Sequence, residues 1–276
     1  MRAVAIIAGR ELRDSLRNRR VVAMTGLMAA LALTLTLLGS APTGTVDVSN
    51  LSVTIVSLSS LTIFLVPLIA LLIAHDAIAG EVERGTMALL LAYPVTRADV
   101  VGGKFLGHTL VLAIAAVVGY GAAGAALAMV GGDVEAGAWQ AFAEMVGSSV
   151  LLGMAFIALG YLASAAVRDS RTAAGIAIGL WLLFVLIYDM ALLGVLVADQ
   201  GRIITPWMLN LLLLANPADI FRLINLTGGP DVSLHAGMTG AVQQSRIGGQ
   251  LLLIALLCWI TVPLVLASLL FGRREL

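Results

Sequence analysis

The chain has 276 residues, of which 60% are hydrophobic and 12% are charged. Soluble domains average about 25% charged and about 45–50% apolar residues, so the composition excludes an ordinary soluble domain and favours an integral membrane protein. The 16 basic and 16 acidic residues cancel, which leaves no electrostatic footprint for nucleic acid. The single cysteine, Cys258, excludes an intrachain disulfide framework.

The first twenty residues predict an amphipathic helix. Four arginines spaced three or four residues apart share one face, and an apolar stripe follows the same period: Arg10, Arg13, Arg17 and Arg20, with Ala5, Ala8, Leu12 and Leu16. Basic side chains attract anionic lipid headgroups while an apolar stripe enters the acyl boundary. We therefore expect residues 1–20 to lie in the membrane interface and to anchor the segment that follows.

Residues 21–276 predict one transmembrane domain of six helices, an all-α fold. A spanning helix needs about 20 mostly apolar residues, and six windows qualify: about 21–39, 51–74, 105–130, 145–167, 173–197 and 247–271. Only the fifth window contains a carboxylate, Asp189. A charge at membrane depth is costly and marks a functional candidate, although an interfacial carboxylate or a pair between helices would give the same pattern.

The basic residues predict the orientation of these spans. Residues 1–20, 75–104, 168–172 and 272–276 hold 13 of the 16 lysines and arginines, whereas residues 40–50, 131–144 and 198–246 hold 3. Cytoplasmic loops carry the excess of Lys and Arg. Both termini are therefore predicted to be cytoplasmic.

The connection between the second and third spans, residues 76–104, predicts a helix, a break and a second helix. Pro94 ends the first helix, and Thr96 with Asp99 three residues later resembles a capping box. The apolar run 87–92 cannot face water and must lie against another surface. Charged residues on this segment form a surface on the cytoplasmic side: Glu81, Glu83, Arg84 and Arg97.

This connection resembles that of type-2 ABC exporter permeases. The matching residues are Glu83-Arg84-Gly85-Thr86, a leucine run, Pro94-Val95-Thr96-Arg97 and Lys104, together with an Arg10-Glu11-Leu12 element near the start. The resemblance implies a homodimer whose cytoplasmic hairpin, the coupling helix, docks on a separate ATPase. It assigns that contact to Glu81, Glu83, Gly85, Thr86, Pro94, Thr96 and Arg97.

Residues 64–94 and 216–223 carry a narrower resemblance, to the permeases of Nos systems. It implies a multi-pass protein of the bacterial inner membrane with two partners, a cytoplasmic ATPase and a periplasmic repeat protein. Their shared task would be the maturation of the copper–sulfur centres of nitrous oxide reductase in denitrification. The alternative is a generic type-2 exporter of a lipid, drug or other small molecule, and the cargo, whether a sulfur species, copper or none, stays open.

Residues 198–246 predict a periplasmic segment with two interfacial or re-entrant helices, over 207–215 and 220–226. Phe221 and Ile224 are three apart and share a face, with Asp219 and Arg222 as a polar rim. Interfaces have an apolar centre and a polar rim. We expect these residues, with the outer loop near Asp47, to dock the periplasmic partner, although lipid anchoring of the same face is the alternative.

The chain carries no motif of an enzyme. The segment around Gly103-Lys104 lacks the first glycine and the Ser or Thr of a phosphate-binding loop, so ATP and Mg²⁺ are expected on the partner ATPase and no cofactor on this chain. Two soft-ligand pairs, Met24 with Met28 and His235 with Met238, suit Cu(I) by type. Methionine more often fills gaps in apolar helices, so no metal site is assigned.

Overall fold

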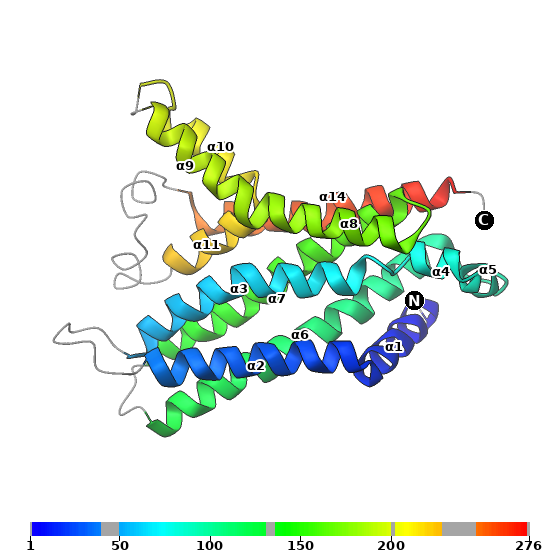
Figure 1. The fold of residues 1–276 in the computed structure, drawn as a ribbon, viewed down its shortest axis with the longest axis horizontal. Coiled ribbons are helices and arrows are strands. Elements are labelled where there is room, and N and C mark those ends of the chain that lie inside the picture. The colour runs from blue at the N-terminus through cyan, green and yellow to red at the C-terminus, as the bar shows by residue number, and fades with distance from the viewer. Residues whose placement is uncertain (1, 40–49, 131–135, 200–201, 228–246, 275–276) are drawn as a thin grey trace.

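The computed structural model describes residues 2–39, 50–130, 136–199, 202–227 and 247–274, and every regular element within these ranges is helical (Figure 1). This confirms the all-α prediction for the described part of the chain. In chain order the elements are α1 (Arg2–Arg17), α2 (Arg19–Gly39), α3 (Asn50–Ala74), α4 (Ala79–Glu83), α5 (Thr86–Leu91), α6 (Arg97–Val130), α7 (Ala136–Ala166), α8 (Ser170–Leu182), the π-helical turn η1 (Leu183–Ile187), α9 (Tyr188–Asp199), α10 (Pro206–Leu214), α11 (Pro217–Thr227) and α14 (Gly249–Gly272).

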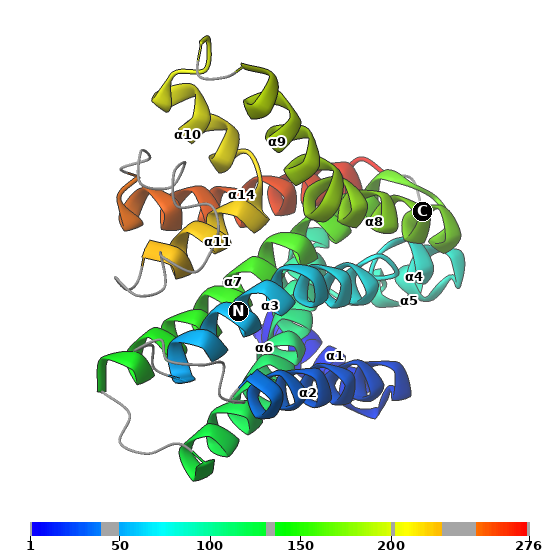
Figure 2. The ribbon, with the colours of Figure 1, turned by 60° about the vertical axis from the view of Figure 1, so that its left-hand side comes forward.

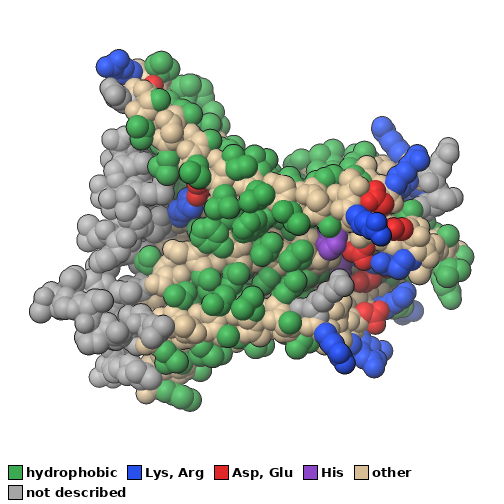
Figure 3. Space-filling model, viewed as in Figure 1, with side chains coloured by type: hydrophobic (Ala, Val, Ile, Leu, Met, Phe, Trp, Pro, Cys, Tyr) green, Lys and Arg blue, Asp and Glu red, His purple; other side chains and the backbone are tan. Residues whose placement is uncertain are grey.

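The core lies around α7, which packs against α3, α6 and α14. Its side chains Phe156 and Tyr161 are fully buried. Small residues bring the backbones close, because a Cβ at Gly160 would stand 2.5 Å from Ala74 Cβ. Many large apolar side chains remain exposed along the bundle, and such a surface is suited to contact with lipid (Figure 3).

Helix α1 lies on α6 rather than continuing the line of α2, from which it is bent by 69°. Two glycines of α6 permit this contact. A Cβ at Gly103 would stand 2.8 Å from Ile7 Cβ, and one at Gly107 would stand 2.6 Å from Glu11 Cβ. Gly103 and Gly107 thus form a small-xxx-small pair that lets two backbones approach closely.

The segment from α8 through η1 to α9 is one long helix that stands at the margin of the bundle. Beyond it, α10 and α11 form a bent pair with an angle of 110°. Figure 2 shows α9 and α10 extending away from the bundle, while α11 turns back to lie on α7 and α14. The two predicted helices of the outer segment are thus present, as α10 and α11.

Five helices of the described residues are long and apolar enough to cross a membrane, and up to seven segments qualify if each bent pair is one span. Each of the six predicted windows coincides with a helix, although α2 qualifies only together with α1. The start of α1 and the end of α14 lie at the same end of the bundle (Figure 1). Most charged side chains visible in Figure 3 gather at that end.

Candidate functional site

The segment between α3 and α6 forms the predicted helical hairpin, with one more break than expected. Gly85 has φ +71 and separates α4 from α5, a left-handed conformation that glycine adopts without steric cost. Helix α5 ends at Leu91, before Pro94. The capping box at the next helix is present, since Asp99 Oδ2 accepts from Thr96 N at 3.1 Å and Asp99 N donates to Thr96 Oγ1 at 3.1 Å.

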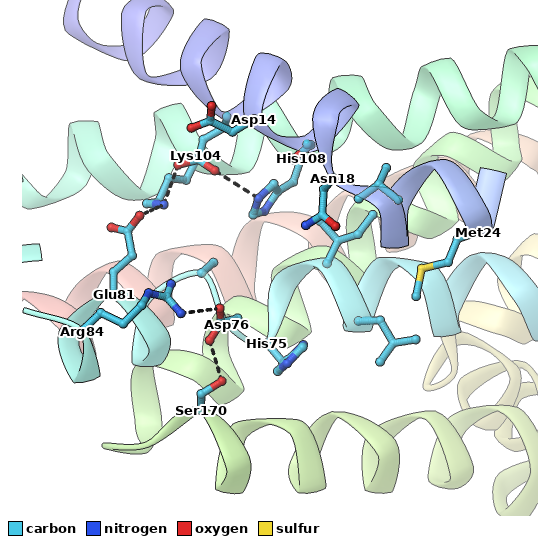
Figure 4. A pocket seen from close by; sticks show the side chains of 16 residues that line it. Asp14, Asn18, Met24, His75, Asp76, Glu81, Arg84, Lys104, His108 and Ser170 are labelled. Atoms are coloured by element: carbon cyan, nitrogen blue, oxygen red, sulfur yellow. Dashed lines mark hydrogen bonds and ion pairs between the residues drawn. The ribbon is translucent and has the colours of Figure 1, made fainter. Parts of the chain in front are cut away.

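Lys104 of α6 joins three elements at the base of this hairpin. Its Nζ donates to Glu11 Oε1 of α1 at 2.6 Å and to Glu81 Oε1 of α4 at 2.7 Å, and its side chain is only 3% exposed. A buried charge is retained in a fold when it is paired and hydrogen-bonded. The pairings therefore hold the amphipathic helix, the hairpin and a span together (Figure 4).

A histidine and a tyrosine extend this network into α7. His108 Nε2 lies 3.4 Å from Glu11 Oε2, and His108 Nδ1 lies 2.9 Å from Tyr161 Oη. Glu11 precedes the first predicted span. Burial alone would raise the pKa of its carboxyl group, but the hydrogen bond with His108 and the charge of Lys104 lower that pKa to about 2. Glu11 is therefore a carboxylate at neutral pH.

A second polar network ties the hairpin to the start of α8. Ser170 Oγ donates to Asp76 Oδ1 at 2.5 Å, and Ser170 N donates to Glu83 Oε2 at 3.0 Å. Arg84 pairs with Asp76 at 3.0 Å. Asp169 caps α8 by accepting from Thr172 N, and this bond holds the pKa of Asp169 below its usual range.

Arg97 is directed toward the end of α14. Its Nη1 donates to three main-chain carbonyls at 2.7, 3.1 and 2.6 Å, those of Phe271, Gly272 and Arg274. The guanidinium also stands 5.4 Å from the centre of the Phe271 ring. The last carbonyls of a helix lack intrahelical donors, so Arg97 acts as a cap for α14. Sequence reasoning placed Arg97 on the hairpin's charged surface and missed this contact.

Two hollows flank the hairpin. A polar cavity of about 500 Å³ lies between α1, α2, α3, α4, α6 and α8, and Figure 4 shows Asp14, Met24, His75 and Asp76 on its walls. A more apolar groove of about 490 Å³ runs between α1 and α5, lined in part by Ile6, Leu90, Tyr93 and Pro94.

The exposed part of the hairpin is the tip formed by α5 and its ends. The side chains of Leu89 and Tyr93 are 70% and 69% exposed, and Glu83, Gly85 and Thr86 are also exposed. Glu81 is different, because it faces inward to Lys104 and its side chain is 17% exposed. The predicted ATPase-contact residues thus divide into an exposed tip and inward-facing supports.

A polar network surrounds Arg222 of α11. Its guanidinium donates to Asp189 Oδ2 and to Asp219 Oδ1, each at 2.6 Å. The Asn216 amide donates to Asp219 Oδ2 at 3.1 Å and to the main-chain carbonyl of Phe184, in the π turn, at 3.0 Å. The alternative weighed for Asp189, a pair between helices, is what the structure has.

The expected apolar docking face on α11 needs correction. Phe221 is fully buried and Asp219 is 1% exposed, while Ile224 packs against the core as a partly buried side chain. The cause is the 110° bend, which turns α11 back onto α7 and α14, so its apolar side chains find partners within the chain. The loop near Asp47 and the pair His235 and Met238 lie outside the described residues.

Lys104, Ser170 and His108 carry contacts that sequence reasoning did not assign. The contacts of Lys104 could have been expected from sequence, because this lysine borders a charge-free window and a charge at that depth needs a counter-ion. Within the described residues no group of three His, Cys, Asp or Glu side chains could hold a metal ion. Met28 is buried in the core and Met24 packs against it.

Comparison with known proteins places this arrangement in a family. Residues 5–276 match the family model described as ABC-2 family transporter protein. Two relatives each carry the name "Probable ABC transporter permease protein NosY". The one from Stutzerimonas stutzeri is 44% identical over 99% of both chains, and the one from Pseudomonas aeruginosa is 44% identical over 100% of both. The chain therefore belongs to the ABC-2 transporter family, as a permease subunit.

Proposed function

We propose that this chain is the permease subunit of a Nos-type ABC complex. A separate cytoplasmic ATPase would hydrolyse ATP with Mg²⁺, and this chain would turn that reaction into transport or into conformational work on a periplasmic partner. Because the chain resembles the permeases of Nos systems, the product of the complex would be the matured copper–sulfur centre of nitrous oxide reductase. The observation that carries the proposal is the 44% identity to two proteins named NosY, over 99% or more of each chain.

The proposed topology has six spans in a bacterial inner membrane, with both termini cytoplasmic. The spans are α2, α3, α6, α7, the continuous α8–η1–α9 helix, and α14. The bias of 13 basic residues to 3 supports this orientation. Helix α1 then lies in the cytoplasmic interface, where its arginines meet headgroups, and the α10–α11 pair is re-entrant from the periplasmic side.

The α5 tip is proposed as the surface that meets the ATPase. Leu89 and Tyr93 supply exposed apolar area next to the groove between α1 and α5. Exposed large apolar side chains rimmed by charge are typical of protein interaction sites. Glu83 and Thr86 form the polar side of this surface, and Pro94 and Thr96 shape the turn behind it.

Lys104 would transmit a displacement of the α5 tip to the helices in the membrane. Because its two ion pairs join α4, α1 and α6, a displacement of the hairpin carries α1 and the start of α6 with it. Packed elements shift between discrete arrangements rather than deforming continuously. Two copies of the chain, one for each ATPase subunit, would move together as a homodimer.

On the periplasmic side the proposed partner is a repeat protein, and the docking surface differs from the one expected from sequence. Since Phe221 and Asp219 are buried, the exposed residues of the α9–α10 arm are better suited to contact. Ile203 and Trp207 are 75% and 62% exposed.

Co-purification from the native membrane tests the proposal. We expect an affinity-tagged chain to retain one ATPase and one periplasmic repeat protein. Deletion of its gene should yield nitrous oxide reductase with less copper per subunit, measured by mass spectrometry of the metal, while transcription of the reductase is unchanged. An ATPase recovered alone, with normally metallated reductase in the deletion strain, would favour a generic exporter.

A further inference from the structure

The helix from Ser170 to Asp199 is weakly packed along its length but is tied to other helices at its start and in its middle. Only 11% of its most apolar stretch is buried, the lowest value among the five long candidate spans of the described residues. Its polar contacts with other helices gather at three positions, Ser170, Trp181 and the region from Phe184 to Asp189. This helix, the rod, is therefore the least buried of the five, although Ala177, Val185 and Leu192 belong to the core.

The cytoplasmic tie connects this rod to the hairpin. Ser170 N is one of the first amide groups of α8, which have no intrahelical acceptor. Glu83 of α4 accepts from it at 3.0 Å, and Asp76 accepts from Ser170 Oγ at 2.5 Å. Two carboxylates at a helix N-terminus also interact favourably with the helix dipole. The hairpin therefore holds the rod by its end.

The middle tie is a single hydrogen bond. Trp181 Nε1 donates to the main-chain carbonyl of Phe64 in α3 at 3.0 Å. It stands about 16 Å along the helix from Ser170, at 1.5 Å per residue. Because few other polar contacts restrain α8 here, this bond is suited to be the point about which the rod tilts.

The outer tie is the ion pair between Asp189 and Arg222, with an N–O distance of 2.6 Å and side chains that are 24% and 23% exposed. Arg222 is held from its other side by Asp219, on the same helix. A guanidinium clamped by two carboxylates has a defined direction. Movement of the rod at Asp189 is therefore transferred to α11.

A π-helical turn lies between the middle and outer ties. The π turn Leu183–Ile187 interrupts the α-helical hydrogen-bond pattern, and Asn216, at the start of α11, donates to its Phe184 carbonyl. Single π turns within α-helices are rare and gather at functional sites. Conversion of the π turn to regular α-helix would rotate everything beyond it relative to everything before it.

We propose that the Ser170–Asp199 helix is the element that transmits hairpin motion to the outer α10–α11 pair, through the Asp76–Ser170 and Asp189–Arg222 contacts. This inference rests on the proposed function, because it requires an ATPase that moves the hairpin. Ser170 and Arg222 are positioning residues, and neither needs to touch the ATPase or a cargo.

The test uses the full complex, reconstituted in lipid nanodiscs. The native cysteine is removed by Cys258→Ala, and a reporter thiol is placed on α10 by Leu211→Cys, at a side chain that is 56% exposed and is not one of the residues proposed to contact the periplasmic partner. The rate of its modification by a membrane-impermeant maleimide is measured without nucleotide and with ATP–Mg²⁺ and vanadate. We expect a change of rate of at least about fivefold, the lower end of typical coupling between sites.

Arg222→Leu should abolish that change. Ser170→Ala removes the bond to Asp76 but keeps the main-chain bond to Glu83, so it should reduce the change, and in both variants the ATPase should still co-purify and hydrolyse ATP. The matched control is Glu144→Gln, which removes a carboxylate bonded to Gln140 on its own helix and should keep the full change. The charge swap Asp189→Arg with Arg222→Asp should restore it. If Arg222→Leu does not assemble, the swap decides, and a swapped complex without the change overturns the inference.

An unaltered rate change in both Ser170→Ala and Arg222→Leu would overturn this inference and leave the proposed function in place. Failure of the reporter chain to retain any ATPase would overturn the proposed function itself, and this inference with it. The two failures are therefore distinguishable by one measurement of subunit content.

Discussion

Lys104 and Glu11 form an ion pair of 2.6 Å between α6 and α1, and the same ammonium group holds Glu81 of the hairpin at 2.7 Å. The lysine side chain is 3% exposed and each glutamate is 17% exposed. One buried cation thus fixes two carboxylates that come from α1 and α4. This geometry makes α1 part of the hairpin's support.

Loss of this cation should destabilise the subunit. Lys104→Met leaves Glu11 and Glu81 buried without their counter-ion, and breaking a buried pair in this way costs about 3–5 kcal/mol. We expect a clearly lower unfolding temperature in detergent. Arg10→Gln is the control, because the Arg10–Asp14 pair is exposed and such pairs contribute about 0–1 kcal/mol. Equal unfolding temperatures for the two variants would contradict the assignment.

The contact between α1 and α6 should depend on two glycines. Gly107→Leu forces a side chain into space held by Glu11 Cβ at 2.6 Å and by the Ala8 carbonyl oxygen at 3.0 Å, so α1 must move away from α6. Protease sensitivity of α1 in the purified protein measures this release. Gly102→Leu is the matched control, since a Cβ at Gly102 meets nothing within 4 Å. Similar cleavage of both variants would count against the packing.

The helices were predictable because their cause is local. Long apolar windows fix where α3, α7 and α14 lie, and the Thr96–Asp99 pair fixes a helix start. The predicted third span began at residue 105 because Lys104 carries a charge, whereas the structure starts α6 at Arg97. A counter-ion supplied by Glu11, 93 residues away, removes the reason for that boundary.

The contacts of α11 and of Arg97 depend on which helices meet in the fold, and the periodicity of the sequence does not encode which helices meet. The face of α11 that carries Phe221 was correctly predicted to be apolar. The surface against which it packs was not predicted, because the bend of 110° between α10 and α11 decides which helices α11 meets. Arg97 looked like a surface charge, since the carbonyls that it caps come from α14 at the other end of the chain. The π turn has no sequence signature in this chain.

The membrane topology can be checked with reporter fusions. Fusions after residues 172 and 276 should report cytoplasm, and fusions after 45, 138 and 235 should report periplasm, because 13 of the 16 basic residues lie on the flanks assigned to the inside. Paired reporters active on opposite sides of the membrane give each position an internal control. A periplasmic signal from the C-terminal fusion would rule out six spans with a cytoplasmic N-terminus.

Docking of the ATPase should depend on the exposed apolar tip of the hairpin. Leu89 and Tyr93 are 70% and 69% exposed, and within the described residues neither side chain makes a hydrogen bond, so a charge there should leave the fold intact. An interface hot spot contributes about 2 kcal/mol or more, which is about thirtyfold in Kd. Leu89→Asp should therefore weaken ATPase binding by at least that factor, measured by titration of the purified ATPase onto nanodiscs. Met129→Asp is the control, because Met129 is 86% exposed and lies at the end of α6 that is far from the hairpin. Normal ATPase affinity in Leu89→Asp, with normal insertion, would move the contact away from α5.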